Sequence, residues 1–176
     1  MTEARIRQAE LAFDADAMTR TSAAEIAALT DAATRSTYYR DGLGPEQIAA
    51  IQRIVHISAD TCATAAASEN QRLVCAFVEG RLGGFLIAPR HAADSREIDW
   101  MMVHPDHHGL GIAAALMRAG IDWLDPRQPQ WLTVVIQNDR AINFYRKFGF
   151  EIDTLFTPRK AIDQWIMRRP AGVALD

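Results

Sequence analysis

The sequence predicts an α/β fold, with one mixed sheet that carries helices on both of its faces. Two observations favour this class. Short apolar runs of strand length alternate along the chain with segments of helical periodicity. One such run, Ile98 to Val103, leads through a glycine-containing loop directly into a helix, and another apolar run follows that helix. We expect a single domain over residues 1–169, followed by a mobile tail at residues 170–176.

Composition excludes several classes of protein. The chain has 176 residues, of which 49% are hydrophobic and 23% charged, and this length suffices for a core of its own. A net charge of −3 argues against general nucleic-acid binding. No apolar run has the roughly 20 residues of a membrane span, and residues 1–7 lack the apolar centre of a signal peptide. Cys62 and Cys75 lack metal-type spacing and are expected to be buried, reduced thiols. We therefore predict a cytoplasmic protein without a nucleic-acid or membrane partner.

The first third of the chain is expected to form a strand and then helices. Residues 4–12 can form the strand. The helices are expected over residues 22–35, from residue 45 onward and, as a short one, near residues 58–60. Ser22 and Glu25 form a capping box at the start of the first helix. Pro45 opens the second helix, on which three branched apolar side chains share one face: Ile48, Ile51 and Val55.

The middle of the chain is expected to add three strands and a helix. A turn at residues 79–81 joins the first two strands into a hairpin, and a polar loop at residues 89–95 precedes the third. These strands are expected over residues 73–78, 82–88 and 98–103. The helix begins after Gly111 and ends at Asp125, because the residue before a proline disfavours helical backbone.

The last third is expected to contain a strand, a helix and two further strands. They are predicted over residues 131–136, 138–148, 150–156 and 162–167. Arg146 and Lys147 lie in the last turn of the helix, and Gly149 is its C-terminal cap. Helices thus separate the central strands of the predicted sheet.

The loop that ends in Gly111 carries most of the functional information. Gly109 and Gly111 allow the backbone to approach a ligand without an intervening Cβ atom. The first amides of the helix that follows have no partner within the helix, and the positive end of the helix dipole lies behind them. Such an arrangement is typical of a phosphate or diphosphate site, so we expect a phosphate-bearing cofactor.

One interpretation of this loop is a dinucleotide site. Gly109 to Ala114 matches the pattern G-x-G-x-x-A, which would make the protein a dinucleotide-dependent oxidoreductase. Three features count against it. The chain has a single strand–helix–strand unit, its strand ends too far upstream for the tight turn, and no strand ending in an acidic residue follows about 20 positions later. We keep this only as a remote alternative.

The other interpretation rests on a family resemblance. Residues 108–113, His-Gly-Leu-Gly-Ile-Ala, are similar to the (Gln/Arg)-x-x-Gly-x-(Gly/Ala) loop of the GNAT superfamily of N-acetyltransferases. Residues 138–150, Asn-Asp-Arg-Ala-Ile-Asn-Phe-Tyr-Arg-Lys-Phe-Gly-Phe, resemble the family's N-x-x-A-x-x-F-Y-x-K-x-G-F block. The similarity covers residues 72–168. It implies a GNAT fold, with a mixed, mostly antiparallel sheet and a central, splayed parallel strand pair.

This resemblance implies acetyl-CoA as cosubstrate. The loop would hold the diphosphate, through His108, Gly109, Leu110, Gly111, Ile112, Ala113 and Ala114. His108 stands where the family usually has Gln or Arg; because a neutral histidine has no fixed charge, we expect weakened affinity. The backbones of Met102 and Val103 would pair with the pantetheine arm, and the Met101 amide would face the thioester carbonyl as an oxyanion donor. Asn138 would contact the cofactor from the opposite side, with Asn143 a weaker candidate.

Tyr145 and Glu97 are the candidate catalytic residues. Tyr145 matches the family's tyrosine that meets the departing thiolate, although a core aromatic would fit the same spacing. Glu97 falls where histone-acetylating members carry a glutamate base, and Asp99 or a water relay are the alternatives. Strand alternation places four residues on one face of their strand: Glu97, Asp99, Met101 and Val103.

The resemblance leads to an acetyl-CoA-dependent N-acetyltransferase that acts on a primary amine of a small molecule or peptide. The alternative is a non-catalytic acyl-CoA-binding sensor on the same fold. No metal is expected, because the histidines of the loop would occupy the phosphate path. The acceptor is expected near the N-terminal helices and residues 157–161, segments that carry Tyr38, Tyr39, His56 and Arg159. A homodimer is left open.

Overall fold

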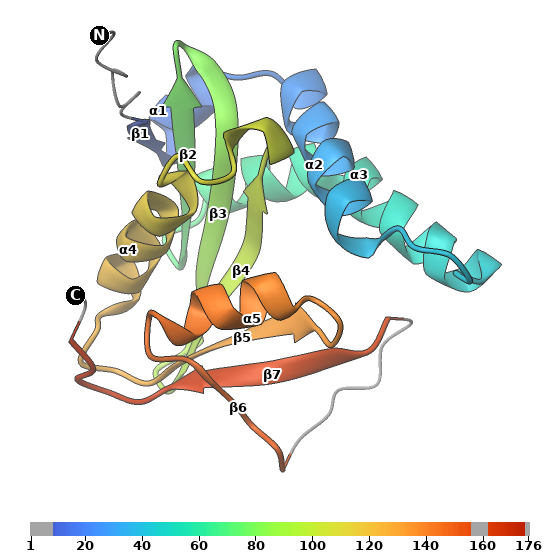
Figure 1. Ribbon diagram of the computed structural model, residues 1–176. Coiled ribbons are helices and arrows are strands. Elements are labelled where there is room, and N and C mark those ends of the chain that lie inside the picture. Colours follow the sequence, from blue (N-terminus) through green and yellow to red (C-terminus); the bar gives the residue numbers. More distant parts are fainter. Residues whose placement is uncertain (1–8, 156–161, 175–176) are drawn as a thin grey trace, which may run out of the picture.

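The structure is a computed structural model that describes residues 9–155 and 162–174 of the chain. Its centre is a seven-stranded sheet in the order β1-β2-β3-β4-β5-β7-β6 (Figure 1). Only β4 and β5 are parallel neighbours in this sheet. The strands are β1 Glu10–Phe13, β2 Gln71–Val78, β3 Arg81–Ala92, β4 Ser95–Val103, β5 Gln130–Val135, β6 Glu151–Ile152 and β7 Gln164–Arg169.

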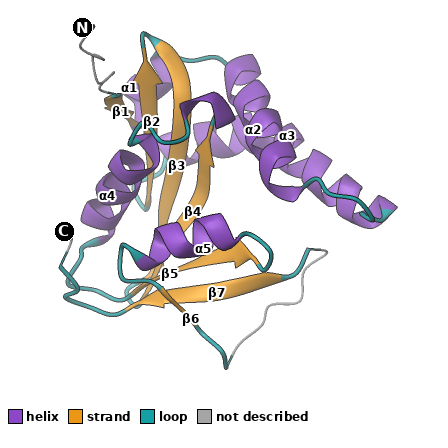
Figure 2. Ribbon diagram, in the orientation of Figure 1, coloured by secondary structure: helices purple, strands orange, loops and turns teal. Residues whose placement is uncertain are grey.

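Helices cover both faces of the sheet (Figure 2). They are α1 Asp14–Thr19, α2 Ala23–Tyr38, α3 Pro45–Ala66, α4 Ile112–Leu124 and α5 Asp139–Arg146, with a short 3-10 helix at Pro105–His107. One apolar core joins α1, α2 and α3 to Leu73 and Phe85 of the sheet. A second core joins α4 and α5 to Val74 and Leu86 on the other face. The predicted α/β class and mixed sheet are confirmed.

The N-terminal segment partly follows the sequence prediction. The Ser22 capping box is present: the Glu25 amide donates to Ser22 Oγ at 3.2 Å, and the Ser22 amide donates to Glu25 Oε2 at 2.9 Å. The prediction of a separate short helix near residue 58 was wrong, because α3 continues unbroken to Ala66. Ser58 donates instead to the Val55 carbonyl within that helix, at 2.8 Å. The short helix α1 was not predicted. The expected first strand, residues 4–12, is present as β1 at Glu10–Phe13, and residues 4–8 of that prediction lie outside the described residues.

The hairpin formed by β3 and β4 is longer than predicted. The expected polar loop at residues 89–95 was wrong, because β3 continues to Ala92 and β4 begins at Ser95. In the ladder between β3 and β4, Arg90 lies opposite Arg96 and Ala92 lies opposite Ser95. The polar residues here therefore belong to the exposed end of a hairpin and not to a loop.

Cys62 and Cys75 are free and buried, as predicted.

The parallel pair β4 and β5 separates along its length, which creates the opening that the site uses. Only Glu97 and Ile98 of β4 are paired with β5, opposite Trp131 and Leu132. Beyond Ile98 the two strands diverge, and β5 with β7 turns away from β1 to β4 (Figure 1). The expected splayed central pair is therefore confirmed. A dinucleotide-binding sheet needs a succession of parallel strands, so that remote alternative was wrong.

A β-bulge at Trp100 lies where the strands begin to separate. The register with β3 changes from Ile87 opposite Asp99 to Phe85 opposite Met102, which places one extra residue in β4. Trp100 takes a left-handed backbone conformation, with φ of 46°. Before the bulge Ile98 faces the core of α4 and α5, and after it Met101 and Val103 do so. The single face predicted for Glu97, Asp99, Met101 and Val103 was therefore wrong.

The end of the chain is attached to the rest of the fold. Arg169 is fully buried and donates to the carbonyls of Phe148, at 3.0 Å, and of Pro126, at 3.3 Å. It also donates to the Val173 carbonyl, and the Gly172 amide donates to Pro126 at 2.9 Å. These contacts hold the segment expected as a mobile tail, as far as residue 174. Among the described residues, no helix has the length and apolar character needed to cross a membrane.

Candidate active site

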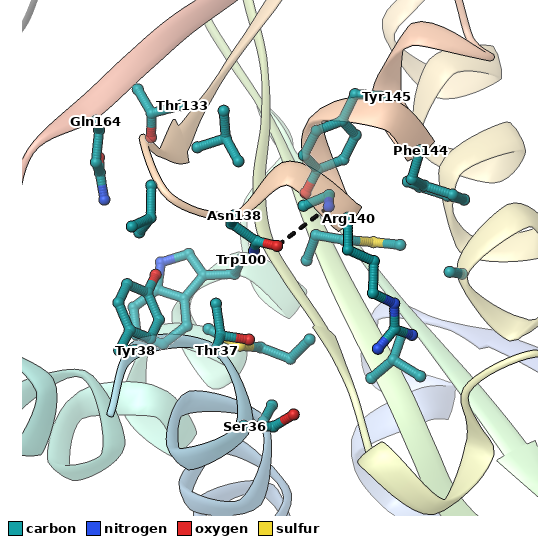
Figure 3. A pocket seen from close by; sticks show the side chains of 18 of the residues that line it. Ser36, Thr37, Tyr38, Trp100, Thr133, Asn138, Arg140, Phe144, Tyr145 and Gln164 are labelled. Carbon is teal, nitrogen blue, oxygen red and sulfur yellow. Dashed lines mark hydrogen bonds between the residues drawn. The ribbon is translucent and has the colours of Figure 1, made fainter. Parts of the chain in front are cut away.

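A cleft of about 730 Å³ opens where β4 and β5 separate. This volume is within the range of small-molecule and cofactor sites. Residues from β4, β5, β7, α2, α4 and α5 line it. In Figure 3, Tyr145, Phe144 and Arg140 lie on one side, and Tyr38, Trp100, Thr133 and Gln164 lie on the other.

The glycine loop borders the first side and ends at the start of α4. Gly109 and Gly111 have φ of 84° and 79°, a conformation that glycine adopts readily. Gly111 is the N-cap of α4, and its carbonyl accepts the Ala115 amide at 3.0 Å. The amides of the first three residues of α4, Ile112, Ala113 and Ala114, have no acceptor within the helix. The geometry is thus that of an anion site at a helix N-terminus.

The edge of β4 that faces β5 is open beyond Ile98. The His104 amide donates to the Gly83 carbonyl of β3 at 2.9 Å, so the backbone N–H of His104 points toward β3. Backbone N–H and C=O groups point to alternate sides along a strand. Those of Met101 and Val103 therefore point toward the cleft, and those of Met102 point toward β3. Met101, Met102 and Val103 all line the cleft. Met102, which was expected to pair with the ligand arm, has its backbone groups directed to β3, so an extended arm has Met101 and Val103 available for backbone pairing.

Two asparagines were expected at the cofactor, and they lie in different places. Asn138 lines the cleft and caps α5, since its Oδ1 accepts the Ala141 amide at 3.1 Å (Figure 3). Asn143 is exposed, does not line the cleft, and accepts a hydrogen bond from Arg146 at 3.2 Å. Helix capping and cleft lining are thus combined in Asn138 alone.

Tyr145 projects from α5 into the cleft (Figure 3). Its side chain is largely buried, and it packs edge-on against Phe144 and Phe150. Burial raises the pKa of Tyr145 well above its ordinary value, and the nearby Tyr38 and Asp99 raise it further. The hydroxyl therefore stays protonated at neutral pH and can donate a hydrogen bond to a developing anion.

The two carboxylates considered as bases have different environments. Glu97 does not line the cleft; it lies on the paired part of β4 and contacts His91 Nε2 at 2.6 Å. Asp99 lines the cleft, and its Oδ1 accepts the Trp100 amide at 2.8 Å. Asp99 also raises the pKa of both Tyr38 and Tyr145. Of the two, only Asp99 is placed among the groups of the cleft.

The second side of the cleft contains two groups that can accept hydrogen bonds: Gln164, which the sequence did not single out, and Tyr38, which was expected near the acceptor. Gln164 of β7 has a buried Oε1 without a hydrogen-bond partner. Tyr38, at the end of α2, lines the cleft, and burial raises its pKa. Tyr39 is exposed under the Arg35 guanidinium, and His56 is exposed; neither lines the cleft. The remaining expected acceptor segment, residues 157–161 with Arg159, is outside the described residues.

His108, which follows β4, contacts a residue that follows β5, the other strand of the splayed pair. Its Nδ1 lies 2.7 Å from Nη1 of Arg140, which belongs to α5. Burial lowers the pKa of His108, the Arg140 charge lowers it further, and a hydrogen bond with the Val103 backbone opposes both. In the described part of the chain, no three potential metal ligands converge. Arg140 was missed because it falls on a variable position of the family block.

Comparisons with known proteins agree with this geometry. The model of the acetyltransferase (GNAT) family matches residues 26–150. An uncharacterised N-acetyltransferase of Mycobacterium tuberculosis is 37% identical over 79 residues, which are 43% of this chain and 49% of that protein. Streptothricin acetyltransferase of Streptomyces lavendulae is 34% identical over 86 residues, 47% of this chain and 46% of that protein. The chain thus spans about half the length of these curated relatives.

Solved structures share the fold over nearly the whole chain. The PaiA N-acetyltransferase of Thermoplasma acidophilum, solved in complex with coenzyme A, superimposes with a TM-score of 0.70 at 16% identity. The match covers 93% of this chain and 99% of that protein. At this level of identity the likeness concerns the fold.

Proposed function

The chain belongs to the GNAT acetyltransferase family, and from this membership we propose that it transfers an acetyl group from acetyl-CoA to a primary amine. The observation that carries the proposal is the convergence of four elements at one cleft. These are the amides at the start of α4, the open edge of β4, the Tyr145 hydroxyl and the Asp99 carboxylate. Together they correspond to the needs of acyl transfer from a long, anionic thioester.

Acetyl-CoA is proposed to enter with its diphosphate at the glycine loop. The amides of residues 112–114 and the dipole of α4 would stabilise the negative charge. The pantetheine arm would then follow β4 as an added strand and use the backbone groups of Val103. This direction brings the thioester to Met101, whose amide would donate to the carbonyl oxygen as negative charge develops there.

In the chemical step, the neutral amine nitrogen attacks the thioester carbon. A C–N bond forms, the C–S bond breaks, the nitrogen loses one proton and the thiolate of CoA leaves. Tyr145 is proposed to donate a hydrogen bond to that thiolate. Because the pKa of Tyr145 is raised above its ordinary value of about 10, complete proton transfer to a thiolate with a pKa near 8.5 is unfavourable. Tyr145 therefore stabilises the leaving group without ionising.

Asp99 is proposed as the group that draws the proton from the amine, in preference to Glu97. The preference rests on position, since Asp99 lines the cleft and Glu97 is held against His91 outside it. Direct transfer from an ammonium to a carboxylate of ordinary pKa is uphill by about 9 kcal/mol. We therefore propose that the proton passes through water to Asp99 and on to solvent, so that the solvent pH and not the Asp99 carboxylate sets the net cost.

The acceptor is proposed to be a small, cationic primary amine. Asp99 supplies negative charge, and the unpartnered Oε1 of Gln164 supplies a hydrogen-bond acceptor on the same side of the cleft. An ammonium group can donate to the Gln164 oxygen and carries a charge opposite to that of Asp99, whereas an acidic or apolar acceptor would leave the Gln164 oxygen without a partner. The similarity to streptothricin acetyltransferase supports a small-molecule amine over a peptide.

The test is release of free thiol from acetyl-CoA with purified protein and three acceptor classes. These are small polyamines, streptothricin-type antibiotics and short peptides with a free amino terminus. We expect turnover with the first or second class and much less with peptides. Tight binding of acetyl-CoA without turnover of any amine would favour the non-catalytic sensor instead, and exclusive turnover of peptides would overturn the small-molecule assignment.

A further inference from the structure

The contact between His108 and Arg140 joins the two elements that border the cofactor end of the cleft. His108 belongs to the glycine loop that follows β4, and Arg140 lies in the first turn of α5, which follows β5. Their side chains meet at 2.7 Å between Nδ1 and Nη1, and both residues line the cleft. The Arg140 side chain extends from α5 into the opening (Figure 3).

The protonation of this pair follows from its geometry. A guanidinium only donates hydrogen bonds, so Nδ1 of His108 must accept, which leaves the proton on the other ring nitrogen. Burial and the adjacent guanidinium both lower the pKa of His108, so the imidazole is neutral at neutral pH. The pair therefore carries one positive charge, and Arg140 holds it.

The positive charge of Arg140 matters because the glycine loop has no cationic side chain of its own. Residues 104–114 contain neither lysine nor arginine. Of the described residues that line the cleft, Arg140 is the only lysine or arginine. A diphosphate carries a negative charge that backbone amides alone do not neutralise, and planar guanidinium groups bind phosphate oxygens through paired hydrogen bonds.

We propose that Arg140 is a diphosphate ligand for CoA, oriented by His108, and that it supplies from α5 the cation that the glycine loop lacks. This inference rests on the proposed use of CoA. Because the loop follows β4 and Arg140 follows β5, the diphosphate is held from both sides of the splayed pair. The other two guanidinium nitrogens, Nε and Nη2, can donate to phosphate oxygens while Nη1 contacts His108.

The experiment compares CoA and dephospho-CoA binding by calorimetry in Arg140→Gln and in the matched control Arg146→Gln. Arg146 is exposed on the same helix and pairs with Glu151. Loss of a charge-assisted pair predicts a Kd about 10- to 100-fold higher for Arg140→Gln, equally for both ligands, since dephospho-CoA retains the diphosphate. The control should stay within about twofold, and melting temperatures should match.

A second substitution tests whether the charge itself is what Arg140 contributes. His108→Arg places a guanidinium in the loop, so in the Arg140→Gln background it should restore most of the lost affinity. Failure to restore it, an unchanged Kd in Arg140→Gln, or a loss confined to CoA, which would indicate the 3′-phosphate, would each overturn the proposal. If the wild-type protein bound no CoA at all, the proposed function itself would fail.

Discussion

The two sides of the cleft differ in the chemistry that they present. The cofactor side has backbone amides, the positive end of α4 and the guanidinium of Arg140. The acceptor side has the Asp99 carboxylate, the buried Oε1 of Gln164 and aromatic residues. One side is therefore suited to an anion and the other to a cation. This difference provides a physical reason for the two substrates to bind at opposite ends, with their reacting groups meeting near Tyr145.

The largest expected effect is a loss of CoA affinity on the cofactor side. Gly111→Asp adds a carboxylate beside the diphosphate and forces a side chain onto a backbone with φ of 79°. Calorimetry should detect no CoA binding, which means a loss of at least about 100-fold. Gly80→Asp is the matched control, since Gly80 has φ of 78° and lies in the β2–β3 turn, away from the cleft. Equal affinity in Gly111→Asp would reject the anion site at α4.

The next effect distinguishes the two carboxylates. Asp99→Asn should lower kcat for the amine by about 10²–10⁴, because it removes the proton acceptor, with little change in CoA affinity. Glu97→Gln should change kcat by less than about threefold. Initial rates for both variants between pH 6 and 9 make the comparison. If the large loss of kcat appeared in Glu97→Gln instead, the base would be Glu97, and the assignment of Asp99 to the acceptor side as proton acceptor would be wrong.

A smaller effect concerns the meeting point of the two sides. Tyr145→Phe keeps the ring and removes the hydroxyl, so kcat should fall at least about tenfold while the Kd for CoA is unchanged. The loss should shrink at lower pH, where solvent protonates the thiolate more readily. Because the pKa of Tyr145 is raised, the wild-type rate should show no decrease from Tyr145 ionisation up to about pH 10. An unchanged single-turnover rate would make Tyr145 a packing residue only.

The smallest effect probes the acceptor side. Gln164→Leu removes a buried acceptor that has no partner in the structure, so the melting temperature should stay the same or rise. The KM for the amine should increase by about 3- to 10-fold, with CoA affinity unchanged. A decrease in melting temperature without any change in KM would show that Gln164 acts in folding and not in binding.

The cofactor side could be predicted from sequence because its geometry is local. Gly109, Gly111 and the start of α4 are consecutive, and their positive φ angles and free amides follow from a short motif. The splay of β4 from β5 followed from the family resemblance. The loop geometry depends on residues that are neighbours in the chain, whereas the splay joins two strands that are far apart in the sequence.

The acceptor side could not be predicted in the same way. Tyr38, Asp99 and Gln164 come from three separate segments, and only tertiary packing brings them to one cleft. The bulge at Trp100 reverses the alternation of β4 after Asp99, and no residue type in that strand signals an inserted position. Arg140 was missed for a related reason, since its partner His108 is 32 residues away in the chain.

The decisive measurement is a crystal structure of the protein with CoA bound. We expect the diphosphate at the amides of residues 112–114, with a guanidinium nitrogen of Arg140 about 3 Å from a phosphate oxygen. We also expect the CoA sulfur within about 4 Å of the Tyr145 hydroxyl, on the side of the cleft that faces Asp99. A diphosphate bound away from α4, or a sulfur far from Tyr145, would show that the cofactor binds in another way.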